Sequence, residues 1–179
     1  MLTTLLGTRR KVLAWVFAIC VLLLAFALYL QHVVGLEPCP MCIVQRYALF
    51  LVAIVAGLSA LPRARSVHLA GTVLALVGSG FGAFVAARQS FLQWYPPEFA
   101  SCSRDFYGMI ETFPLRRAIP MIFKGSGDCT AIDWTFLGLS IANWSFIAFA
   151  GMAIALLYAL LRRKLSLIHI SEPTRLGMI

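Results

Sequence analysis

Long runs of uncharged, mostly apolar residues alternate with short polar segments along the chain. Residues 12–30 and 69–87 form two runs of 19 uncharged residues, and residues 134–161 form a third run of 28. At about 1.5 Å per residue, such helices cross a hydrocarbon core of about 30 Å. The run 47–61 has only 15 residues, so its helix spans a membrane only if it begins near Cys42. The pattern predicts four transmembrane helices, over about 12–30, 42–61, 69–87 and 143–161.

The composition excludes an ordinary soluble domain. Of the 179 residues, 61% are hydrophobic and 12% are charged, whereas soluble domains carry about 25% charged residues. We therefore expect an all-α membrane protein, with one four-helix transmembrane domain over residues 1–164. Residues 165–179 show neither a spanning pattern nor an amphipathic stripe. They are expected to be a non-native or disordered tail.

The net charge of +8 indicates membrane topology rather than nucleic-acid binding. Basic residues form short clusters at the ends of the apolar runs, whereas a nucleic-acid surface would interleave them with exposed polar and aromatic residues. The positive-inside rule places both termini and the loop 62–67 in the cytoplasm, and the loops 31–41 and 88–133 outside. The basic clusters are Arg9, Arg10 and Lys11, then Arg63 and Arg65, then Arg162, Arg163 and Lys164.

The five cysteines divide into one within a span and four in the outer loops. Cys20 lies in the middle of the first run, where a thiol packs as a small hydrophobic side chain. Cys39, Cys42, Cys102 and Cys129 are compatible with two structural disulfides, with a four-thiolate zinc site, or with a redox-active pair. The spacing of Cys39 and Cys42 favours the redox interpretation, because a bridge across so small a loop adds little stability and is readily reduced.

The position of Cys42 predicts a reactive thiolate. It lies near the start of the second helix, where unpaired backbone N–H groups and the helix dipole favour an anion. Arg46 follows one turn later on the same face, so its guanidinium is a candidate partner for the thiolate. A second interpretation of Arg46, compatible with the first, is an anchor at the membrane interface.

Six segments together resemble the DsbB family of bacterial inner-membrane disulfide oxidoreductases, over about residues 13–161. The C-x-x-C motif alone is weakly specific, but the combination is highly specific. The segments are Gln31-His32, Glu37-Pro38-Cys39-Pro40-Met41-Cys42, Gln45-Arg46, Leu92-Gln93-Trp94-Tyr95-Pro96 before Cys102, Gly127-Asp128-Cys129, and Trp134-Thr135-Phe136-Leu137-Gly138-Leu139.

This resemblance implies a thiol oxidase in the inner membrane with its active site facing the periplasm. It would reoxidise a periplasmic dithiol protein of the DsbA type and pass the electrons to a membrane quinone, either ubiquinone or menaquinone. By position, Cys102 would exchange with the partner, Cys129 would resolve that mixed disulfide, and Cys39 would exchange with the second-loop pair. The quinone would meet Cys42, beside Arg46 and, less firmly assigned, Gln93.

Two positions depart from the pattern of some family members, because Gln45 stands where some carry an acid and Gln89 where some carry histidine. Two other functions remain open. One is an enzyme of the vitamin K epoxide reductase type, although its C-x-x-C motif is expected late in the chain. The other is a non-enzymatic membrane protein with four spans and structural disulfides, whose bridges would stay oxidised whatever the quinone supply.

Overall fold

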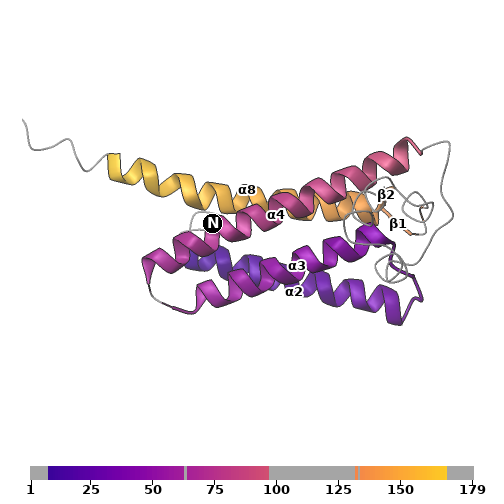
Figure 1. Ribbon diagram of the computed structural model, residues 1–179, viewed down its shortest axis with the longest axis horizontal. Coiled ribbons are helices and arrows are strands. Elements are labelled where there is room, and N and C mark those ends of the chain that lie inside the picture. Colours follow the sequence, from indigo (N-terminus) through magenta and orange to yellow (C-terminus); the bar gives the residue numbers. More distant parts are fainter. Residues whose placement is uncertain (1–7, 63, 97–131, 133, 169–179) are drawn as a thin grey trace, which may run out of the picture.

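The computed structural model describes residues 8–62, 64–96, 132 and 134–168, with side chains to residue 162. Within this part of the chain, four helices lie side by side as a bundle (Figure 1): α2 (Arg9–His32), α3 (Pro40–Ala60), α4 (Arg65–Trp94) and α8 (Ile141–Ile168). All four are long and apolar enough to cross a membrane. The predicted all-α, four-helix membrane fold is therefore confirmed.

The predicted helix bounds require correction at several ends. Helix α3 begins at Pro40 rather than Cys42, because proline suits the first helical position, where no N–H is needed for the helix. Helix α4 runs beyond Ala87 to Trp94, since a charged residue such as Arg88 can end an apolar run without ending backbone hydrogen bonding. Helix α8 continues into the predicted tail as far as Ile168.

Helix α4 is central to the bundle and packs most extensively against α8 and α3, while α2 packs mainly on α3. The start of α2, the α3–α4 connection and the end of α8 lie at one end of the bundle (Figure 1). There the Nε of Arg9 donates to the Ala159 carbonyl at 3.3 Å, and the Nε of Arg10 to the Ala60 carbonyl at 3.0 Å. The bond from Arg10 satisfies a carbonyl in the last turn of α3, which lacks a partner within the helix. The bond from Arg9 joins the start of α2 to α8.

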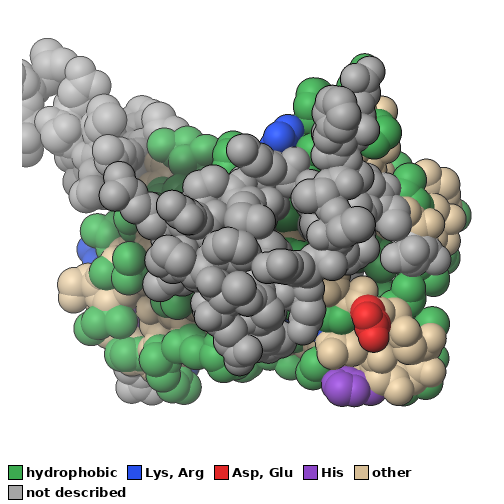
Figure 2. Space-filling view, turned by 45° about the vertical axis from the view of Figure 1, so that its right-hand side comes forward, with side chains coloured by type: hydrophobic (Ala, Val, Ile, Leu, Met, Phe, Trp, Pro, Cys, Tyr) green, Lys and Arg blue, Asp and Glu red, His purple; other side chains and the backbone are tan. Residues whose placement is uncertain are grey.

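The bundle interior contains many small residues, whereas large apolar side chains face outward. Buried alanines from α3 and α4 lie in the same core as Phe149 and Leu156 of α8. Hydrophobic side chains cover much of the described surface (Figure 2). Outward-facing examples from the four helices are Leu22, Leu58, Val77, Phe84 and Ile154. This arrangement suits a bundle surrounded by lipid tails, where close helix packing rather than exclusion from water holds the helices together.

Gly82 provides a direct test of this packing. A Cβ atom at Gly82 would overlap the buried Phe149 ring of α8, whereas a Cβ at Gly80 meets nothing within 4 Å. We expect Gly82→Ala to destabilise the bundle by about 1–3 kcal/mol, the usual cost of overpacking. Gly80→Ala is the matched control and should be neutral or slightly stabilising. Thermal unfolding in detergent measures both, and equal stability of the two variants would contradict the α4–α8 packing.

A short hairpin precedes α8, and the sequence pattern did not predict it. Strands β1 (Thr135–Phe136) and β2 (Leu139–Ser140) pair antiparallel, with Thr135 opposite Ser140 and Phe136 opposite Leu139. The two turn residues, Leu137 and Gly138, have φ of 53° and 77°, as a two-residue hairpin turn of the favoured twist requires. The Ser140 hydroxyl then accepts the Asn143 N–H at 3.5 Å, capping the start of α8.

Candidate redox site

Cys39 and Cys42 lie together where α3 begins. Cys39 is the N-cap residue, and its sulfur accepts the backbone N–H of Cys42 at 3.3 Å. The two Sγ atoms are 2.7 Å apart, so a small movement would bring them to the bonding distance of about 2.05 Å. The predicted position at a helix N-terminus is therefore confirmed for the pair. The structure adds that the capping N–H is directed to Cys39, whereas the sequence argument considered only Cys42.

A buried pair of carboxamides adjoins both sulfurs. The Nε2 of Gln89, on α4, lies 3.3 Å from the Sγ of Cys39 and 3.3 Å from the Sγ of Cys42. The Oε1 of Gln89 accepts the Nε2 of Gln45, on α3, at 2.7 Å. In the sequence, these glutamines stood out only as departures from a family pattern. The contact of Gln89 with the sulfurs was missed, although its partner Gln45 lies one turn from Cys42.

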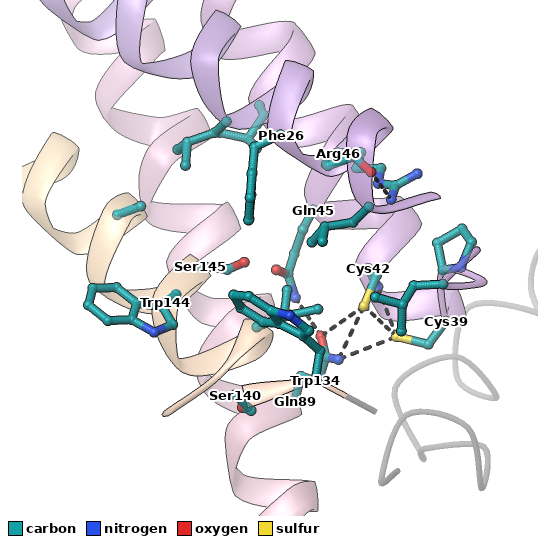
Figure 3. Close-up of a pocket in the computed structure, with 18 of the residues that line it drawn as sticks. Phe26, Cys39, Cys42, Gln45, Arg46, Gln89, Trp134, Ser140, Trp144 and Ser145 are labelled. Atoms are coloured by element: carbon teal, nitrogen blue, oxygen red, sulfur yellow. Dashed lines mark hydrogen bonds between the residues drawn. The ribbon is translucent and has the colours of Figure 1, made fainter. Parts of the chain in front are cut away.

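The sulfurs open onto a cavity of about 490 Å³ between the helices. Most of its wall is apolar. Of its polar groups, Gln45, Arg46 and Gln89 lie near the cysteines, whereas Ser140 and Ser145 lie farther away (Figure 3). Cavities of this size, mostly apolar with a few placed polar groups, are typical of small-molecule sites. The polar and sulfur-bearing lining residues are Glu37, Cys39, Cys42, Gln45, Arg46, Gln89, Gln93, Ser140 and Ser145.

Arg46 lines this cavity, but its recorded hydrogen bonds go to α2. Its guanidinium donates to the Gln31 side chain and, at 3.0 Å, to the Ala27 carbonyl. Among the described residues, none of its hydrogen bonds reaches the Cys42 sulfur one turn earlier. The guanidinium carries five N–H donors, so these two bonds leave further donors for a ligand in the cavity.

Four aromatic rings form another part of the cavity wall. Trp134 stacks on Phe136 at 6.0 Å between ring centroids and meets Phe26 of α2 edge-on at 6.1 Å. The Trp144 indole N–H donates to the Phe136 carbonyl at 3.1 Å, which ties α8 to the hairpin. Gln93 is also on this wall, where its Oε1 accepts the Ser140 hydroxyl at 2.6 Å. The hairpin therefore positions both aromatic and polar groups of the cavity.

The remaining cysteines fall into two groups. Cys20 is fully buried in the core, with its sulfur 3.6 Å from that of Met152, in agreement with the predicted packing role. Cys102 and Cys129 lie outside the described residues. Within the described part, no three His, Cys, Asp or Glu side chains gather as metal ligands would.

Fold and site together define a multi-pass membrane protein with a closely spaced cysteine pair facing an apolar cavity. A family model described as "Disulfide bond formation protein DsbB" matches residues 9–159. Because this match covers most of the chain, the protein belongs to the DsbB family, as its motifs predicted. It is therefore a disulfide-forming oxidoreductase of the membrane.

Individual relatives agree with this assignment. The chain is 75% identical over 145 residues to Disulfide bond formation protein B of Polaromonas sp. (strain JS666 / ATCC BAA-500), covering 81% of this chain and 86% of that one. It is 68% identical over 166 residues to the protein of the same name from Polaromonas naphthalenivorans (strain CJ2), covering 92% and 99%. A more distant relative of that name, from Azoarcus sp. (strain BH72), is 52% identical over 158 residues, covering 87% and 95%.

Proposed function

We propose that this protein reoxidises a periplasmic dithiol protein of the DsbA type and passes the electrons to a membrane quinone. One observation carries the proposal: the paired sulfurs of Cys39 and Cys42 border a mostly apolar cavity between the helices, large enough for a small ring compound. A DsbA-type protein has a reduction potential of about −120 mV, so its oxidant must be more oxidising than soluble thiol pools. A quinone meets that requirement.

The cavity has the chemistry that a quinone ring would need. Its apolar and aromatic wall suits a flat ring and an isoprenoid tail, and Arg46 supplies N–H donors for carbonyl oxygens. A bound quinone would accept two electrons and two protons and leave as the quinol. Donors preorganised beside oxygens that gain negative charge would lower the barrier to that reduction.

The electrons would reach this site through two thiol–disulfide exchanges. In the first, the partner's dithiol reduces a Cys102–Cys129 disulfide, with Cys102 forming the mixed disulfide and Cys129 resolving it. In the second, the Cys102–Cys129 dithiol reduces the Cys39–Cys42 disulfide by the same chemistry. Each exchange breaks one S–S bond and forms another, so two electrons and two protons arrive at Cys39 and Cys42 for transfer to the quinone.

The purified chain tests the proposal directly. With a reduced DsbA-type protein and ubiquinone or menaquinone, it should oxidise the dithiol protein and produce one quinol per disulfide formed. Omitting the quinone should stop the reaction after the cysteines of the chain itself are reduced. Oxidation that continues without quinone, or cysteines that never change state, would refute the proposed electron path.

The orientation in the membrane can be tested by labelling intact spheroplasts. We propose that the end of the bundle with Cys39 and Cys42 faces the periplasm, because the basic clusters mark the opposite end as cytoplasmic. After reduction, an impermeant maleimide should label Cys42, Cys102 and Cys129, with slower labelling of the buried Cys39. Cys20 should remain unlabelled because it lies in the core. Labelling of only one of the two loops would contradict the topology.

A further inference from the structure

The Gln45–Gln89 pair is placed to control the cysteine sulfurs as well as to fill the core. Gln45 and Gln89 are only 4% and 3% exposed, and they come from two different spanning helices. Burying two carboxamides is costly unless their polar atoms are paired. Here the Gln89 NH₂ group lies 3.3 Å from both the Cys39 and Cys42 sulfurs. The Gln89 carbonyl accepts the Gln45 NH₂ group at 2.7 Å and lies 3.8 Å from the Cys42 sulfur (Figure 3).

The bond between the glutamines fixes which end of the Gln89 amide meets the sulfurs. A carboxamide can turn over and exchange its oxygen for its NH₂ group with little change in shape. Because the Gln45 NH₂ group occupies the Gln89 oxygen at 2.7 Å, the Gln89 NH₂ group is left facing both sulfurs. Without the Gln45 donor, the Gln89 amide would lose the contact that selects this orientation.

Donors that face sulfur stabilise the reduced state more than the oxidised state. A thiolate accepts a charge-assisted hydrogen bond, which is about twice as strong as a bond to a neutral acceptor such as a disulfide sulfur. Stabilising the reduced form of a cysteine pair makes that pair more oxidising. Glutamine is neutral at every physiological pH, so this contribution requires no protonated side chain.

We propose that Gln89 raises the reduction potential of the Cys39–Cys42 couple by donating to its sulfurs, and that Gln45 is the positioning residue that orients Gln89. The inference rests on the proposed redox cycling of this cysteine pair. In the half-reaction, the disulfide takes up two electrons and two protons and becomes the dithiol, which ionises to the thiolate that Gln89 stabilises. Gln45 acts on the sulfurs only through Gln89.

The test is a redox titration of the full-length, quinone-free chain with Cys102 and Cys129 replaced by serine. Equilibration with reduced and oxidised glutathione gives the potential of the remaining pair, since two glutathione thiols reduce one disulfide. Gln89→Met keeps the side-chain length without the donor. We expect the equilibrium constant for reduction to fall about tenfold, which is about 30 mV for a two-electron couple. The alkylation rate of Cys42 by iodoacetamide at pH 7 should fall by a similar factor.

Gln45→Met should lower the equilibrium constant for reduction about threefold, because Gln89 remains but its amide is no longer held in place by Gln45. Thr72→Val is the matched control. It removes a buried hydroxyl from α4, the helix that carries Gln89, and this hydroxyl donates at 2.6 Å to the His68 carbonyl and not to sulfur. Its potential and alkylation rate should equal those of the unmodified protein. Thermal unfolding confirms that each variant is folded.

The possible results distinguish the proposed redox cycling of the cysteine pair from the proposed role of the two glutamines. If the unmodified pair never titrates between dithiol and disulfide, the proposed function fails. If it titrates but Gln89→Met matches Thr72→Val in both potential and alkylation rate, redox cycling stands and the role of Gln89 is overturned. If Gln89→Met shifts the potential and Gln45→Met does not, Gln89 acts alone and the positioning role of Gln45 is overturned.

Discussion

Replacing Cys42 by serine should reduce quinone-dependent turnover by roughly a thousand-fold or more, the scale of loss when a nucleophile is removed. A serine hydroxyl cannot form the disulfide with Cys39, and it ionises far less readily than a thiol. The Cys42 sulfur also borders the cavity and contacts Gln89. We therefore expect the variant to remain folded but to be unable to transfer electrons from the dithiol partner to the quinone. Quinol formation, followed by absorbance, is the measurement.

Cys20 provides the control for this experiment. Its thiol is also buried, but it packs against Met152 in the core and does not line the cavity. Cys20→Ala should lower thermal stability through the small space that it leaves, while turnover per folded molecule stays unchanged. If Cys42→Ser retained turnover comparable to that of Cys20→Ala, electrons would not pass through the Cys39–Cys42 pair.

Replacing Arg46 by alanine should raise the quinone KM about ten- to a hundred-fold, because a charge-assisted hydrogen bond is worth about 1.5–3 kcal/mol. The guanidinium lines the cavity and is held by Gln31 and the Ala27 carbonyl of α2. Exchange with the dithiol partner should change little, since Arg46 makes no recorded bond to either sulfur among the described residues. Arg46→Lys should restore the quinone KM only in part, because lysine lacks the planar set of donors of arginine.

Arg88→Ala is the matched control for Arg46. It removes an arginine near the same end of the bundle, lying 5.7 Å from the Phe91 ring and absent from the cavity wall. Quinone titrations normalised to folded protein should show a normal KM for this variant. An unchanged KM in Arg46→Ala, with a lower yield of inserted protein, would leave Arg46 as an anchor at the membrane interface.

The spans and the cysteine pair were predictable because they depend on local properties of the chain. Whether a segment can cross a bilayer depends mainly on its own length and hydropathy, and the three longer runs met both conditions. The Cys-Pro sequence at 39–40 likewise determines where α3 begins, although the predicted start at Cys42 was two residues late. The end of α4 was misplaced because polarity at Arg88 marks a membrane boundary, not a helix end.

Sequence alone therefore determined the four-helix class, the DsbB family and a cysteine pair at a helix N-terminus. The tertiary structure alone decided that Gln45 and Gln89 meet beside the sulfurs, and that Arg46 bonds to α2. These contacts depend on how neighbouring helices are rotated and shifted, and that is set by close packing such as Phe149 against Gly82. A glycine in one helix shows that something can approach closely, but only the packed bundle shows which side chain does.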